Sequence, residues 1–146
     1  MAALPVEDEL AIRNLLARYA DAASRRDADD WVATWAPDCV WDLGGGRVTR
    51  GRDETVALWK ESIAKYPWVA QLPASGSIEL VDDEVRGTWY VLELNHLADG
   101  SGAMHFGRYR DTYVRTDDGW RFGVRRFDLV YRGAMDPGTL NPLKEG

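Results

Sequence analysis

The residues best suited to chemistry gather on one alternating stretch, residues 105–115. Because strand side chains alternate between two faces, His105, Tyr109 and Asp111 lie on the same face. A histidine beside a carboxylate can act as a general acid or base near neutral pH, and a phenol can hold a substrate oxygen. The pattern favours His105 and Asp111 as catalytic residues of a pocket, although a strand-end histidine half in water explains it equally well.

Tyr19 is a third candidate catalytic residue. Residues 8–24 repeat apolar side chains at helical spacing, and Tyr19 lies on the apolar stripe. A buried phenol needs a hydrogen-bond partner, which is either a ligand oxygen or another group of the core. Both possibilities are open at this point.

The sequence shows no pattern typical of a metal site or of a nucleophilic cysteine. The chain has two histidines, His96 and His105, and one cysteine, Cys39, none with metal-site spacing. The segment 46–51 has the glycine spacing of a phosphate-binding loop but lacks the lysine that follows it there. We therefore expect neither a metal nor a cofactor.

Composition restricts the class of protein. A chain of 146 residues fits one domain, which we expect to span residues 1–146 with a core at 8–131 and an irregular tail at 133–146. The net charge of −6 argues against a nucleic-acid partner, and no apolar run is long enough to cross a bilayer. A single cysteine fits a reducing compartment, so we expect a cytoplasmic protein without a membrane partner.

The period of the apolar pattern changes along the chain. It follows a helix in the first part and becomes a strand period of two from residue 76 onward. The predicted helices are 8–24, 27–35 and 53–66, and the predicted strands are 39–43, 77–81, 84–95, 105–115 and 120–131. Helices followed by an antiparallel sheet predict an α+β fold with the helices on one face.

The frame YADAASRRDADDW…APDCVWDLGGG…RG, closing with YVRTDDGWRF, resembles the SnoaL-like group of the nuclear-transport-factor-2-like superfamily. The resemblance covers about residues 8–131. It implies a cone in which three helices pack on a curved, mainly antiparallel sheet around a deep apolar pocket. Members include polyketide cyclases, scytalone dehydratase, a dehydrochlorinase, ketosteroid isomerase and plain binding proteins, so it specifies fold better than function.

The resemblance also places family residues on this chain. Tyr19 matches the tyrosine that donates to the oxyanion in ketosteroid isomerase, whose base falls at or beside Leu43. The aspartate of the dehydratase Asp–His dyad falls on Ser24, and its histidine falls near Gln71. Neutral groups cannot act as general bases near neutral pH, so proton transfer would come from elsewhere in the pocket: from His105, Asp111, His96 or Asp128. The segment from His105 to Asp111 is the first place to look for the base.

Two functions are compatible with these residues. The first is a cofactor-free enzyme of dehydratase, isomerase or cyclase type that moves a proton on a hydrophobic cyclic small molecule. The second is a non-catalytic binding or accessory subunit, because the usual dyad is replaced. The seven tryptophans fit either a cavity lining or a packed core, and we expect a homodimer or homotrimer. The residues expected to bind substrate are Ser24, Trp41, Leu43, Gln71, Trp89 and Tyr109.

Overall fold

Helices precede a long-stranded sheet in the computed structural model, which describes residues 3–139. The sheet order is β2-β1-β6-β5-β4-β3, with antiparallel neighbours except for β1 and β6, which run parallel. The predicted α+β class is confirmed. The helices are α1 (Val6–Arg25), α2 (Ala28–Val32) and α3 (Gly51–Ile63), and the strands are β1 (Trp35–Asp42), β2 (Val48–Arg50), β3 (Trp68–Val81), β4 (Glu84–His96), β5 (Gly102–Thr116) and β6 (Gly119–Met135), followed by a short 3-10 helix, η1 (Pro137–Thr139).

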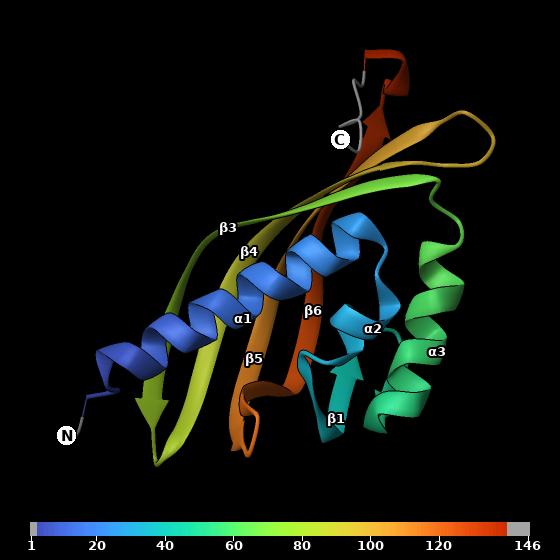
Figure 1. Ribbon diagram of the computed structural model, residues 1–146. Helices are drawn as coiled ribbons and strands as arrows, with labels where there is room; N and C mark the ends of the chain where they lie inside the picture. The colour runs from blue at the N-terminus through green and yellow to red at the C-terminus, as the bar shows by residue number, and fades with distance from the viewer. Residues whose placement is uncertain (1–2, 140–146) are drawn as a thin grey trace, which may run out of the picture.

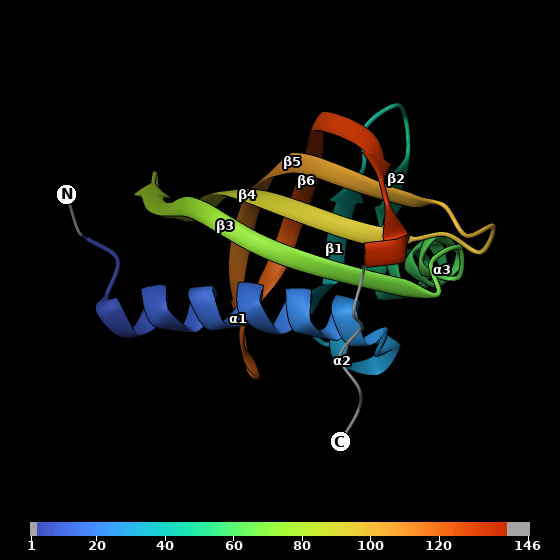
Figure 2. The ribbon, with the colours of Figure 1, turned by 90° about the horizontal axis from the view of Figure 1, so that it is seen from above.

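The helices lie on one face of a curved sheet. Figure 1 shows α1 laid across β3, β4, β5 and β6, with α2 and α3 beside it near β1. Seen from above in Figure 2, the strands bend around the space that α1 and α3 border. Since α1 packs mainly against β3 and α3 against β1, the two helices close opposite sides of the concave face.

The predicted apolar stripe of α1 is its buried face. Ile12, Leu15, Leu16, Tyr19 and Ala23 are all buried, as a helical repeat of apolar side chains requires. The helix begins after Pro5, which fits the first turn because its missing N–H has no intrahelical acceptor there.

The second helix is shorter than predicted. Asp27 caps it by accepting from the backbone N–H of Asp30, but the helix ends at Val32 rather than at Trp35. The carbonyl of Thr34 accepts from the N–H of Phe122 at 3.0 Å, so the chain has already joined the sheet. Trp35 therefore opens β1, although both it and the tryptophan one turn earlier are buried as expected.

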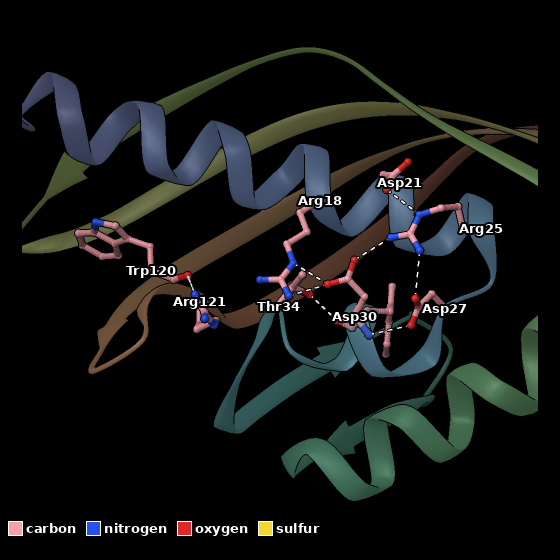
Figure 3. A network of polar contacts seen from close by, with 9 residues as sticks. Arg18, Asp21, Arg25, Asp27, Asp30, Thr34, Trp120 and Arg121 are labelled. Carbon is pink, nitrogen blue, oxygen red and sulfur yellow. Dashed lines mark hydrogen bonds and ion pairs between the residues drawn. The ribbon is translucent and has the colours of Figure 1, made fainter. Parts of the chain in front are cut away.

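Surface ion pairs connect α1 to α2, as Figure 3 shows. Arg18 and Arg25 both reach Asp30, at 2.5 and 2.7 Å. Arg25 also contacts Asp21 and Asp27. Water and salt screen exposed pairs of this kind, so the network orients the short helix more than it stabilises the fold.

The strand boundaries were only partly predictable. β3 begins at Trp68, nine residues before the predicted strand 77–81, because Pro73 and a register shift before Gly76 interrupt its alternation. A Cβ at Gly76 would lie 2.2 Å from the ring of Trp89, so only glycine lets the strand pass this indole. Strand β2 was not predicted.

The start of the predicted tail is strand instead. We expected irregular chain from residue 133, but β6 continues to Met135 because Ala134 and Met135 still pair with β5. A 3-10 turn follows at Pro137–Thr139. The rest of the predicted tail, residues 140–146, lies outside the described residues.

A buried ion pair lies at the centre of the sheet. Arg125 on β6 donates to both carboxylate oxygens of Asp111 on β5, each at 2.9 Å, and both side chains are fully buried. Tyr113 donates to the same carboxylate at 3.0 Å and accepts from the indole N–H of Trp89 at 2.7 Å. Burial opposes the charge of Arg125, but the Asp111 carboxylate outweighs it and raises the pKa of the guanidinium.

Aromatic rings surround the Arg125 guanidinium. Its central carbon lies 3.8 Å from the ring centre of Tyr109, 4.1 Å from that of Phe122 and 4.3 Å from that of Tyr19. The negative faces of these rings attract the cation in the absence of water. Tyr19 comes from α1 and Tyr109 from β5, so the cation connects helix and sheet.

Replacing Arg125 with methionine should leave the Asp111 carboxylate in the core without a counter-charge. Removing one partner of a buried pair typically costs about 3–5 kcal/mol, and R125M should lose about that much free energy of unfolding in urea. The double variant R125M/D111L removes both charges and should regain most of the loss. A double variant as unstable as R125M alone would show that the pair is not what the core depends on.

Candidate functional site

A cavity of about 160 Å³ lies between the helices and the concave face of the sheet. Most of its wall is apolar or aromatic. Trp59 in this wall stacks on the core residue Trp31, with ring centres 4.7 Å apart, so tryptophans serve both the core and the lining. The apolar lining consists of Ala23, Trp41, Leu43, Trp59, Ile63, Val69, Val91 and Phe127, and the polar lining of Tyr19, Arg47, Ser62, Tyr66, Gln71, Glu93, His105 and Tyr109.

His105 meets a carboxylate in this cavity. Nδ1 of its ring lies 3.5 Å from Oε1 of Glu93 and 3.3 Å from the amide nitrogen of Asn95. The residues come from β5 and β4, where His105 and Glu93 are paired directly across the ladder and therefore share a face. Because these polar neighbours lie at Nδ1, the ring leaves Nε2 for a ligand.

Gln71 and Ser24 occupy adjoining positions. The backbone N–H of Gln71 donates to Oγ of Ser24 at 2.9 Å, and this hydroxyl donates to the carbonyl of Ala20 at 2.9 Å. The side-chain amide of Gln71 donates to Oε2 of Glu93 at 3.1 Å. Thus the two positions where the resemblance places a dyad do lie together. The Ser24 hydroxyl holds the backbone of Gln71, and the Gln71 side chain holds the Glu93 carboxylate.

Two phenols line the cavity next to each other. Tyr19 on α1 and Tyr109 on β5 have ring centres 6.2 Å apart in an edge-on arrangement. Burial raises the pKa of Tyr19, with Arg125 opposing the shift, and burial raises the pKa of Tyr109 well above its ordinary value. Both phenols therefore keep their protons and can donate hydrogen bonds at neutral pH.

The lining residue Trp41 has a buried hydrogen-bond donor without a partner. The indole nitrogen of Trp41 is buried and has no hydrogen-bond partner within residues 3–139. Buried donors are normally satisfied, so an acceptor from a ligand or from water would complete it.

Not every predicted site residue reaches the cavity. His105, Tyr19 and four of the predicted substrate-binding residues line it: Trp41, Leu43, Gln71 and Tyr109. Ser24 and Trp89 instead line a neighbouring groove along α1, to which Gln71 also contributes.

Asp111 is separated from His105 although both lie on one strand face. Six residues of extended chain span about 20 Å, which carries the Asp111 carboxylate deep into the core. There it is held by Arg125 and Tyr113. The structure therefore places Asp111 in the framework of the sheet rather than in the cavity.

Glu93 is the charged partner of His105, and sequence reasoning missed it among the lining residues. On β4 it follows Trp89 and Val91 at a spacing of two, and both of these are buried. This alternation was a usable signal, because it places Glu93 on the same inward face. A carboxylate in an otherwise apolar strand face is uncommon, and its presence there indicates a specific partner.

No group of three or more histidine, cysteine, aspartate or glutamate side chains within residues 3–139 is arranged to hold a metal ion. In the same part of the chain, no helix is both long enough and apolar enough to cross a bilayer.

The buried phenols should make stability depend on alkaline pH. Unfolded tyrosines lose their protons near pH 10, whereas Tyr19, Tyr109 and Tyr113 have raised pKa values in the fold. Their contribution is complete below about pH 10 and is lost as pH rises towards the folded values, by about 1.4 kcal/mol per pH unit and phenol. Urea unfolding at increasing pH should show this decline, and Y109F should decline less steeply.

Replacing the exposed Tyr131 provides the matched control. Y131F should leave the alkaline slope close to that of the parent protein. If Tyr109 produced phenolate absorbance near pH 10 while the protein was still folded, the raised pKa of Tyr109 would be contradicted.

A family model supports the arrangement described above. The model for the SnoaL-like domain matches residues 5–126, which is most of the chain. An uncharacterized protein of Mycobacterium tuberculosis is 29% identical over 131 residues, covering 84% of this chain and 85% of that protein.

Solved structures agree in fold. A hexachlorocyclohexane dehydrochlorinase, LinA type 2, superimposes with a TM-score of 0.84 at 19% identity, covering 94% of this chain and 95% of that chain. A proposed scytalone dehydratase from Novosphingobium aromaticivorans gives 0.82 at 19% identity, covering 97% and 96%. At such identities the likeness establishes the shared fold alone. The match over residues 5–126, by contrast, shows that this chain belongs to the SnoaL-like family.

Proposed function

We propose that this protein is a cofactor-free lyase or isomerase that moves a proton on a hydrophobic cyclic small molecule. The observation that carries the proposal is the pairing of His105 with Glu93 in an otherwise largely apolar cavity. The dehydrochlorinase named above and the proposed scytalone dehydratase belong to lyase classes that this cavity also suits. We further expect a single-domain, cytoplasmic homodimer or homotrimer.

His105 acts as the base in this proposal. In this role the ring carries its proton on Nδ1, where it faces the Glu93 carboxylate, so Nε2 is unprotonated and accepts the substrate proton. The carboxylate of Glu93 stabilises the positive charge that the ring then carries. Gln71 holds Glu93 in place through its amide, which makes Gln71 and Glu93 positioning residues.

Tyr19 and Tyr109 stabilise negative charge on the substrate. When the C–H bond breaks, its electron pair moves into a new double bond and either expels a leaving group or builds charge on a carbonyl oxygen. A protonated phenol within reach donates to that oxygen, and such donors act strongly where water is excluded. In a dehydration, the proton taken by His105 would leave with the hydroxyl group as water.

The lining explains the preference for a cyclic, apolar substrate. The aromatic rings of Trp41, Trp59 and Phe127 line the cavity, and such a lining suits another ring. A cavity of about 160 Å³ is small and favours a compact molecule of one or two rings. Specific polar contacts would then come from the phenols and the histidine.

Replacing His105 tests the base directly. H105Q should lower kcat by about 10²- to 10⁴-fold on a substrate that the parent protein turns over, because a positioned general base contributes that much. Y19F should lower kcat by about 10²- to 10³-fold through loss of an oxyanion donor. A panel of cyclic β-hydroxyketones and β,γ-unsaturated ketones, followed by the ultraviolet absorbance of the conjugated product, provides the assay.

His96 supplies the control for the same substitution. It ends β4 one residue beyond Asn95 and is not part of the cavity lining, so H96Q should keep the parent kcat. Full activity in H105Q would refute the role of His105.

A non-catalytic binding protein is the second candidate. It is favoured by the hydrogen bond between Ser24 and the Gln71 backbone, where related dehydratases carry the dyad according to the resemblance. Saturable binding of cyclic ketones, without turnover of any member of the panel by the parent protein, would select this function.

A further inference from the structure

Arg47, which lines the cavity, and Arg132, which pairs with the lining residue His105 across the sheet, have no carboxylate partner within residues 3–139. Arg47 lines the cavity and is exposed, and Arg132 is exposed on β6. Other surface arginines, such as Arg18, Arg25 and Arg110, form ion pairs with aspartates. We refer to Arg47 and Arg132 as the arginine rim.

The loop that carries Arg47 fixes its position. Gly44, Gly45 and Gly46 all adopt positive φ angles between 60° and 83°, a conformation that glycine adopts at little cost. The turn is closed by hydrogen bonds from the N–H of Leu43 to the carbonyl of Arg47 at 2.9 Å and from the N–H of Arg47 to the carbonyl of Gly44 at 3.1 Å. The arginine therefore starts from a defined backbone position beside the lining residue Leu43.

Arg132 lies next to the proposed base. It is paired with His105 across β5 and β6, and directly paired residues of a ladder share a face of the sheet. Burial and Glu93 raise the pKa of Tyr66, whereas Arg132 and Arg47 oppose this shift, so both cations act on the same lining residue. The two charges therefore converge on the Tyr66 end of the cavity from different elements.

The charges inside and at the edge are of opposite sign. Glu93 lies within the cavity, and the whole chain carries a net charge of −6, which by itself repels anions. A pair of unneutralised arginines at the edge of such a protein reverses the local field. Guanidinium groups bind oxyanions such as carboxylates and phosphates by charge-assisted hydrogen bonds.

We propose that the arginine rim binds an anionic substituent of the ligand, so that the substrate is a cyclic molecule with an oxyanion at one end. The ring occupies the apolar cavity near His105, and the oxyanion remains at the exposed edge between Arg47 and Arg132. This proposal deepens the proposed function and rests on it for the identity of the reacting end of the molecule. The binding step itself is measurable without turnover.

The test compares three probes of one ring system: 2-naphthoate, 2-naphthyl phosphate and the neutral 2-naphthamide. Isothermal titration calorimetry measures their binding to the parent protein, R47Q and R132Q. Each substitution should weaken the two anions about fivefold, as for exposed ion pairs at the upper end of their range, and leave the amide unchanged. Added salt should weaken the anions selectively, because the rim is exposed to solvent.

R50Q is the matched control, since Arg50 is exposed on β2, carries the same charge and is not part of the cavity lining. It should leave all three affinities unchanged. A parent protein that binds 2-naphthoate and 2-naphthyl phosphate no more tightly than 2-naphthamide, or variants that weaken all three probes equally, would overturn the proposal. The tighter of the two anions identifies the substituent. H105Q should lose turnover but keep the preference for the two anions over the amide, so a failed rim and a failed base give different results.

Discussion

Arg125 and Asp111 face each other across β6 and β5 in the core, where either charge alone would cost several kcal/mol. This requirement fixes the register of the two longest strands, because a slip by one residue would turn one partner to the opposite face of the sheet. It also fixes α1, since Tyr19 lies against the same guanidinium. Tyr19 and Tyr109 form part of the cavity wall. The buried pair of Arg125 and Asp111, which lies in the core beneath the cavity, therefore positions this wall.

The inward face of β5 divides into two parts. Its beginning carries His105 in the cavity, and its later part carries Asp111 and Tyr113 in the core, with Tyr109 between them. Gly107 lies at the transition, where a Cβ would come within 2.2 Å of the Phe127 ring. The missing side chain lets this ring cross the strand and close the cavity wall beside Tyr109. One strand thus supplies both the proposed chemistry and the framework that positions it.

Local periodicity was enough to predict the inward faces of α1 and β5. Ile12 to Ala23 and His105 to Asp111 follow simple repeats, and the structure has them on the expected sides. Periodicity could not tell which carboxylate would reach the cavity, because that depends on cross-strand partners. Asp111 pairs with Arg125 of β6, which follows β5 after a turn, and is therefore held in the core. The register between β4 and β5 instead places Glu93 opposite His105. The first half of β3 was missed because Pro73 and Gly76 weaken a strand that its long pairing with β4 nevertheless supports.

The parallel pairing of β1 with β6 has a consequence for how the molecule assembles. β1 follows the first two helices, yet its neighbour in the centre of the sheet is the last strand of the chain. Contacts between such distant segments form late, since a large loop must close before they contribute. During synthesis, the part of the cavity wall formed by Trp41 and Leu43 is therefore made before β6, which carries Arg125 and Phe127. A chain that stops short of β6 lacks Phe127 in the cavity wall, so the cavity is complete only when the sheet is complete.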